Sequence, residues 1–161
     1  MQEITLRKID SSDKKYFAIW WRDKDLIELT SGDTNPISDQ EIDQYFQAIL
    51  DSKTDYYFMI AADKEIIGHI SLSRRENDWY EIQIVIGQKE YWNQGYGTAA
   101  IKLLIDKVDH LGASKIYLEV RPTNVRAIGA YENCGFKRIK IISHHEDDHL
   151  PETLRMELQN N

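Results

Sequence analysis

The chain has 161 residues, of which 42% are hydrophobic and 29% charged, and its formal net charge is −7 at pH 7. This length suits one domain over residues 1–161, and no apolar run approaches the roughly 18 residues that a membrane span requires. The negative charge, without a basic stripe, argues against binding to nucleic acid and is compatible with a cationic substrate.

The first third of the chain predicts a strand and two helices. Ile4–Ile9 alternates between apolar and polar residues, as a half-buried strand does. A short helix follows, and we expect Ser11 or Ser12 to cap it. Ser38 begins the second helix, because Glu41 stands three residues later and completes a capping box.

Three strands then follow in close order and predict an antiparallel meander. They are Tyr56–Ala62, Glu65–Ser73 and Trp79–Ile86. Asp63-Lys64 and Asn77-Asp78 supply the tight turns between them, since Asn and Asp tolerate the backbone conformations that such turns need.

The remaining chain predicts two helices and three strands. Gly95–Leu111 is amphipathic, and Gly112 ends it. The other expected elements are the strand Lys115–Val120, a helix from Asn124 or Thr123 to about Asn133, and the strands Phe136–Ser143 and Thr153–Leu158. This order is typical of a mixed α/β fold with an antiparallel first half and a crossover helix in the second half.

The segment Gly95-Tyr96-Gly97-Thr98, which opens the amphipathic helix, predicts an anion site. Glycines leave backbone N–H groups uncovered, and a helix N-terminus attracts negative charge. We therefore interpret this turn as a cradle for the pyrophosphate of a ligand.

Two nucleotide-binding motifs compete for this turn. Gly95-x-Gly97-x-x-Ala100 satisfies the dinucleotide fingerprint, and Glu119 ends the next strand at a suitable distance. However, Gln88–Gln94 separates the turn from the preceding strand, whereas the glycine turn of a dinucleotide fold follows its strand at once. A P-loop is excluded because the sequence Gly-Lys-Ser/Thr is missing.

The helix that follows identifies a family resemblance. Asn124–Phe136 reads NVRAIGAYENCGF and resembles the N-x-R-A-x-x-x-Y-E-x-x-G-F signature of the GNAT superfamily of acetyl-CoA-dependent N-acetyltransferases. Tyr91–Thr98 is similar to that superfamily's pyrophosphate loop, particularly in the branch that acetylates ribosomal-protein N-termini and polyamines. The resemblance covers about residues 3–158. Trp92 and Gly129 depart from it, because Gln or Arg and a basic residue are frequent there.

The resemblance implies one N-acetyltransferase domain with a mostly antiparallel sheet of about seven strands and about four helices, splayed at the cofactor strand. In such a sheet the backbone of Ile84, Val85 and Ile86 pairs with the pantetheine arm of acetyl-CoA. The N–H groups from Gln94 to Thr98, with the Thr98 hydroxyl, hold the pyrophosphate.

Two further side chains are implied in cofactor binding, each with an alternative. Asn124 resembles the asparagine that contacts the cofactor in the family, and it suits an N-cap of its helix equally well. Arg126 either pairs with a phosphate or faces solvent. One asparagine side chain does not easily fulfil both of its roles.

Acetyl transfer to an amine needs a base, because an ammonium with a pKa near ~10.4 must lose a proton before it attacks. Glu81 is the expected base, since its place fourteen residues before Gly95 resembles that of the catalytic glutamate in histone-acetylating members. Its alternative is an exposed strand carboxylate. Tyr131 matches the family tyrosine that protonates the leaving thiolate, and its alternative is a core aromatic.

Other reactive side chains have a structural explanation. Cys134 is expected to be a buried thiol rather than a nucleophile, and a single cysteine fits a reducing, cytoplasmic environment. The histidines and acids of segment 144–149 suggest a metal site, but this segment lies between two strands, which favours a solvated hairpin loop. The N-terminus, Met1–Ile4, lacks the apolar region of a signal peptide.

The acceptor is expected to be a cationic small molecule or a peptide amine. Trp20 and Trp21 offer an aromatic wall, with Glu28 nearby, and Asp147 and Asp148 make the last loop acidic. An aminoglycoside, a polyamine or a protein N-terminus would suit these residues. The alternatives are ordinary surface charge and a noncatalytic acyl-CoA-binding module; a homodimer is compatible with the resemblance.

Overall fold

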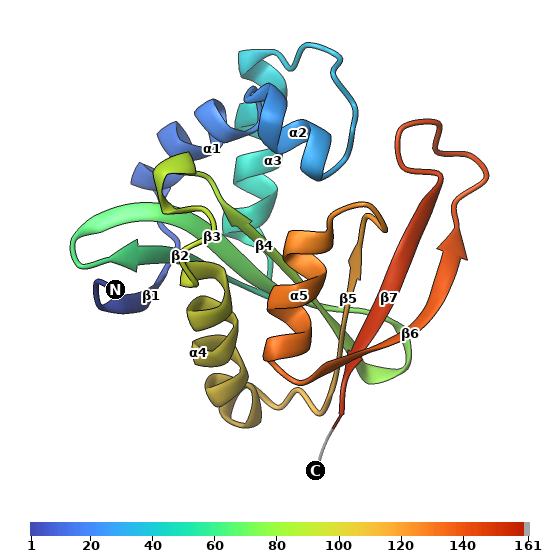
Figure 1. The fold of residues 1–161 in the computed structure, drawn as a ribbon. Helices are drawn as coiled ribbons and strands as arrows, with labels where there is room; N and C mark the ends of the chain where they lie inside the picture. Colours follow the sequence, from blue (N-terminus) through green and yellow to red (C-terminus); the bar gives the residue numbers. More distant parts are fainter. Residues whose placement is uncertain (160–161) are drawn as a thin grey trace.

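The computed structural model describes residues 1–159 and contains one seven-stranded sheet, in the order β1-β2-β3-β4-β5-β7-β6 (Figure 1). The strands are β1 (Ile4–Lys8), β2 (Asp55–Ala62), β3 (Glu65–Arg74), β4 (Trp79–Ile86), β5 (Lys115–Val120), β6 (Phe136–Ser143) and β7 (Glu152–Leu158). The α-helices of this part of the chain are α1 (Lys14–Trp20), α2 (Lys24–Leu29), α3 (Asp39–Asp51), α4 (Tyr96–Leu111) and α5 (Val125–Asn133). The mixed α/β fold expected from the sequence is therefore confirmed.

The sheet opens between its two central strands. All neighbouring strands pair antiparallel except β4 and β5, which run parallel. Their ladder covers only Trp79–Glu81 of β4 and Lys115–Tyr117 of β5, after which the two strands diverge (Figure 1). The edge of β4 beyond Glu81 thus has no strand partner on this side within the described residues, which is the splay that the family resemblance implies.

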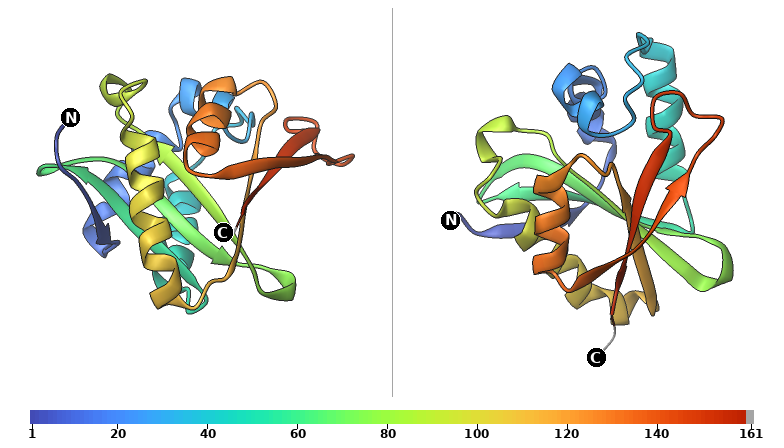
Figure 2. Two further views of the ribbon diagram at one scale, coloured as in Figure 1. Left: turned by 60° about the horizontal axis from the view of Figure 1, so that its bottom comes forward. Right: turned by 45° about the vertical axis from the view of Figure 1, so that its right-hand side comes forward.

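Helices cover both faces of the sheet, each over its own apolar cluster. Figure 2 shows α4 on one face and α1 with α3 on the other. The larger cluster joins α4 and α5 to the sheet through buried residues such as Ile82, Leu104 and Ile128. The smaller one joins α1 and α3 to the sheet through Phe17 and Phe46. Glu81 and Val85 project toward the second face, because alternate residues of β4 face opposite sides.

Several turns and caps follow the sequence, and one differs from it. Ser38 and Glu41 form the expected capping box at the start of α3, and Asp63 makes its hairpin turn with a positive φ. Before α1, however, Asp10 caps a 3-10 helix over Ser11–Asp13 that leads directly into α1, so neither Ser11 nor Ser12 is the cap. This correction has a simple cause, because the Asp10 carboxylate accepts from the Ser12 N–H and forms a capping box with Asp13.

The helix α2 was not expected from the sequence. It is six residues long, and the Asp23 carboxylate caps it by accepting from the N–H groups of Asp25 and Leu26. A helix of this length carries almost no periodic signal, so its cap and the burial of Leu26 decide its formation. No described helix is long and apolar enough to cross a membrane.

Candidate active site

A cleft of about 1200 Å³ opens where β4 and β5 diverge. It brings together residues that are far apart in the sequence, from α1 and β4 through the N-terminus of α4 to α5 and the β6–β7 loop. Most residues that the sequence nominated line it, including Glu81, Gly97, Arg126 and Tyr131.

The N-terminus of α4 presents backbone donors to this cleft. Gly95 is the N-cap, with φ 85°, and no side chain caps the helix. The first N–H groups of any helix lack partners within the helix, so those of Tyr96, Gly97 and Thr98 are available to an anion. The Tyr96 side chain is buried, and its hydroxyl accepts from the Gln2 N–H at 3.3 Å.

Trp92 fixes the loop before this helix to the end of β4. Its indole Nε1 donates to the carbonyl oxygen of Ile86 at 2.8 Å, and the Arg126 guanidinium lies 4.3 Å above its ring. Arg126 is exposed at the cleft wall, as its solvent-facing alternative expected, and it also lies over the Trp92 ring. The Gln94 side chain does not line the cleft, because its amide donates to the Glu90 carbonyl.

Asn124 serves as a helix cap. Its side-chain oxygen accepts from the Ala127 N–H at 3.3 Å at the start of α5. The residue also lines the cleft, so it lies beside the space expected to hold the cofactor while it performs the capping role.

Glu81 lies at the apex of the cleft, in the last pair of the β4–β5 ladder. Its side chain is only 16% exposed, and its Oε2 forms an ion pair of 2.8 Å with Arg75 Nε. The carboxylate is thus held by a fixed cation at the point where the two strands separate.

Tyr131 contributes a protonated hydroxyl to the cleft from α5. Burial raises its pKa to about 12, and its ring packs edge-to-face against Phe136, with 6.3 Å between centroids. Near neutral pH this side chain carries no charge, and its hydroxyl can act as a hydrogen-bond donor. The position suits donation to a leaving group as well as packing.

Cys134 is a half-buried thiol at the end of α5. Its Sγ donates to the Thr98 carbonyl at 3.6 Å, and burial raises the pKa of the thiol. A raised pKa keeps little thiolate at neutral pH, so the geometry favours a structural role over nucleophilic catalysis.

The two adjacent tryptophans lie in different environments. Trp20 is 4% exposed and stacks on Tyr16 and near His69, which makes it part of the core beneath the cleft. Trp21 is half-buried and meets the Tyr45 ring edge-on at 6.2 Å. Glu28 is exposed and does not line the cleft in which we expected it.

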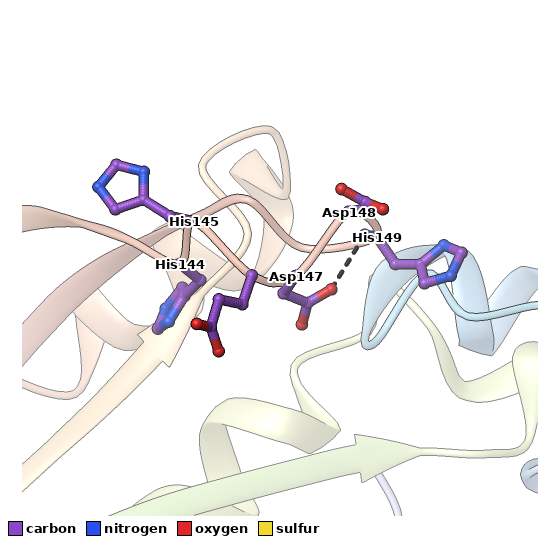
Figure 3. Close-up of a pocket in the computed structure, with 6 residues that line it drawn as sticks. His144, His145, Asp147, Asp148 and His149 are labelled. Atoms are coloured by element: carbon purple, nitrogen blue, oxygen red, sulfur yellow. Dashed lines mark hydrogen bonds between the residues drawn. The ribbon is translucent and has the colours of Figure 1, made fainter.

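The β6–β7 loop divides its polar side chains between the cleft and an outer hollow. Asp147 lines the cleft, and its Oδ1 accepts from the N–H groups of His149 and Leu150, which lowers the pKa of this carboxyl. Asp148 lines only the outer hollow, so it lies outside the cleft. The rings of His144 and His145 point to opposite sides of the loop (Figure 3).

No group of three His, Cys, Asp or Glu side chains among residues 1–159 is arranged to hold a metal ion. The i, i+4 spacing of His145 and His149 does not bring their rings together, because the segment forms a loop and not a helix.

Arg121 joins this loop to the segment after α2. Its Nη2 donates to the carbonyl oxygens of Thr30 and His149, at 3.0 and 2.9 Å. The His149 ring lies 3.8 Å from Asp33. The two segments therefore meet, and both contribute residues to the lining of the cleft.

Sequence reasoning did not identify one hydrogen-bonded group of the cleft. Thr153 donates to Glu119 at 2.7 Å, and His144 lies 2.9 Å from the Thr153 hydroxyl. All three residues line the cleft. They meet because β7 inserts between β5 and β6, a strand order that the sequence spacing does not indicate.

The chain matches the family model described as an acetyltransferase (GNAT) domain over residues 3–137. It is 40% identical over 52 residues to the ribosomal protein bS18-alanine N-acetyltransferase of Escherichia coli. The matched segment covers 32% of this chain and 35% of that protein. The chain spans between 29% and 53% of the length of the curated relatives it matches.

Two solved structures share the fold along nearly the whole chain. One is spermidine N-acetyltransferase from Vibrio cholerae in complex with CoA and spermine, with a TM-score of 0.83, 22% identity, and coverage of 96% of this chain and 94% of that one. The other is AAC(6')-Ib in complex with ribostamycin and coenzyme A, with a TM-score of 0.82, 19% identity, and coverage of 98% and 94%.

Proposed function

Because the chain belongs to the GNAT acetyltransferase family, we propose that it transfers an acetyl group from acetyl-CoA to a primary amine by direct attack in a ternary complex. The observation that carries this proposal is that β4 and β5 pair over only three residues and then diverge. The cleft between them reaches the start of α4, which Gly95 caps. The pantetheine arm with its thioester needs a free strand edge, and the pyrophosphate needs uncovered N–H groups next to that edge.

Acetyl-CoA is proposed to extend from the α4 N-terminus along the free edge of β4. The N–H groups of Tyr96, Gly97 and Thr98 suit its pyrophosphate, since they need no side chain to neutralise charge. The backbone of Ile84–Ile86 suits the amides of the pantetheine arm, which would add to the sheet as a further strand. Arg126 above Trp92 supplies the nearby positive charge.

Glu81 and Tyr131 are the proposed acid–base pair. Glu81 lies at the apex of the splay, where the thioester would end. Tyr131 is protonated at neutral pH, as any tyrosine with an ordinary or raised pKa is, so its hydroxyl can donate to the departing thiolate. Cys134 is left out of the proposed mechanism, since direct attack needs no acyl-enzyme.

The proposed acceptor is a polyamine, an aminoglycoside or a peptide N-terminus with several positive charges. Its side of the cleft carries carboxylates from four separate elements and segments, which favours a cation. These acids are Asp33, Glu41, Glu119 and Asp147. Trp21 and Tyr45 add aromatic surface that suits the aliphatic and cationic parts of such amines.

The direct test follows CoA thiol release from acetyl-CoA with spermidine, kanamycin and a basic peptide as acceptors. We expect release with at least one polycationic amine and intersecting lines in double-reciprocal plots, as a ternary complex gives. Binding of acetyl-CoA without turnover on any amine would instead support the noncatalytic acyl-CoA-binding module. Parallel lines would overturn direct attack.

Replacing Glu81 tests the base. Glu81→Gln should lower kcat by about 100-fold, the lower end of the range for general-base catalysis, with the largest loss at acidic pH. Glu76→Gln is the matched control, because Glu76 is exposed beside the same strand. A pH–rate profile that is the same in wild type and Glu81→Gln would remove Glu81 from the mechanism.

A further inference from the structure

The three side chains that the sequence did not connect form a continuous hydrogen-bonded chain. Glu119 Oε2 accepts from the Thr153 hydroxyl at 2.7 Å, and His144 Nε2 lies 2.9 Å from the same hydroxyl. His144 Nε2 also lies 3.4 Å from Glu119 Oε2. Thr153 is 3% exposed, so the middle of this chain is shielded from water while Glu119 lines the cleft.

The chain leads from the cleft to the outside of the molecule. His144 lines both the cleft and the outer hollow of about 660 Å³ under the β6–β7 loop. Its side chain is 36% exposed, against 21% for Glu119. In Figure 3 its ring points from the loop toward the sheet.

The loop holds the His144 ring in place through its backbone. The His144 N–H donates to the Pro151 carbonyl at 2.7 Å, and the His144 carbonyl accepts from the Asp147 N–H at 3.0 Å. The side chain therefore starts from a fixed point at the base of the loop.

The members of this chain can pass a proton on, whereas the partner of Glu81 cannot. A hydroxyl and an imidazole each donate and accept, but a guanidinium only donates. A proton taken by Glu81 thus has no onward route through Arg75. A proton taken by Glu119 has one: the Thr153 hydroxyl, which donates to the Glu119 carboxylate, accepts from Glu119 once Glu119 is protonated and passes its own hydrogen to His144 Nε2.

We propose that Glu119, Thr153 and His144 form a proton relay that takes a proton from the acceptor ammonium in the cleft and releases it beneath the β6–β7 loop. This inference rests on the proposed acetyl transfer. It gives Glu119 contact with the amine, and it makes Thr153 and His144 positioning residues that act through Glu119.

The proton balance of the reaction requires such an exit. An ammonium acceptor loses two protons when it becomes an amide. The N–C bond forms as the C–S bond breaks, the electron pair of that bond leaves with sulfur, and one of the two protons ends on the CoA thiol. In the proposed mechanism Glu81 and Tyr131 handle the proton that ends on the CoA thiol. Glu119 takes the second proton, which must leave the cleft in every turnover, and the relay supplies its route.

Other ionisable groups surround the relay and remain in place during its test. On the sheet, Arg155 lies 3.8 Å above the Tyr117 ring and pairs with Glu157, and Glu81 pairs with Arg75. On the loop side the facing groups are Asp147, His149 and Arg121.

The test compares Thr153→Val, which keeps the shape and removes the hydroxyl, with Thr153→Ser, which restores it. In thiol release with the best amine, we expect Thr153→Val to lower kcat by roughly tenfold to 100-fold, while the KM for acetyl-CoA changes by less than about twofold. Thr153→Ser should stay within about threefold of wild type. His144→Gln should lower kcat similarly.

The double variant Thr153→Val/His144→Gln should lose no more activity than either single variant, because members of one relay act as a unit. Equal kcat in wild type, Thr153→Val and His144→Gln would overturn the relay. If wild type releases no thiol with any amine, the proposed function fails instead, so the two failures differ. A circular dichroism melt confirms that each variant is folded.

Discussion

The two halves of the cleft are built in different ways. The half proposed for acetyl-CoA comes from one stretch of chain, β4 and the start of α4, and it offers mainly backbone groups. The acceptor half is built from side chains of distant segments, as the bond between Arg121 and Thr30 illustrates, since these residues lie 91 positions apart. The first half is thus constrained by backbone geometry, while the second depends on which side chains the fold brings together.

This difference explains why the residues of the acetyl-CoA half could be predicted from the sequence and those of the acceptor half could not. Backbone donors need glycine at particular positions, and Gly95 keeps its φ of 85° where few other residues fit. Acceptor contacts need no particular residue, so they leave no fixed pattern. The comparison predicts that substitutions in the two halves affect different measured quantities.

The largest expected effect is on stability, and it should differ between the two adjacent tryptophans of the acceptor half. Trp20→Ala should lower the free energy of unfolding by roughly 3–5 kcal/mol, because it empties a core site that is 4% exposed. Trp21→Ala should cost less stability and raise the KM for the amine instead. Urea unfolding with initial-rate kinetics checks both, and equal stability losses would contradict the distinction.

Tyr131→Phe should have the next largest effect, on chemistry and not on binding. We expect kcat to fall by about 100-fold, with little change in the KM for acetyl-CoA, because the proton donor to the thiolate is lost. Thiol release measures this. Full turnover by Tyr131→Phe would show that the residue only packs against Phe136.

The raised pKa of Tyr131 also has a consequence for stability at alkaline pH. Its folded-state pKa of about 12 lies above the ordinary value of 10.0, so the stability it contributes is fully present below pH 10 and is lost as the pH rises through 12. In that window Tyr131→Phe should resist alkaline unfolding better than wild type does, in a titration followed by circular dichroism.

Gly97→Ala should have the smallest effect. We expect it to raise thermal stability slightly and to weaken the binding of acetyl-CoA. An added Cβ finds Ile86 Cγ1 at 3.9 Å, so the free protein accommodates it. Alanine within a helix is favoured over glycine by roughly 0.5–1 kcal/mol, so thermal stability should rise. Affinity for acetyl-CoA should fall by roughly tenfold, because a methyl group stands where the pyrophosphate meets the backbone. Unchanged affinity would contradict the proposed cradle.

Much of the fold could be predicted because its signals are local. Ser38 with Glu41, the turn at Asp63 and the glycine that starts α4 each act within a few residues. Which side of α4 is covered is not a local signal of this kind. Tyr96 and Ile101 are buried there, whereas Lys107 is exposed, since the sheet and not the helix decides which side is covered.

The acceptor half was harder to predict, for reasons of strand order and pairing. Glu119 and Thr153 meet only because β7 pairs with β5, and His144 joins them at the base of the loop between β6 and β7. The pairing of Glu81 with Arg75 is likewise invisible in the sequence, although both residues flank one turn. Side-chain partners across a sheet depend on register, which composition and periodicity do not fix.

The most direct test of the central assignment is a calorimetric titration of the wild-type protein with acetyl-CoA and, separately, with NADH. The splayed β4 edge and the glycine-capped start of α4 predict one acetyl-CoA bound per chain and no heat from NADH at the same concentrations. Binding of NADH, or no binding of acetyl-CoA, would contradict the assignment of the cleft to coenzyme A.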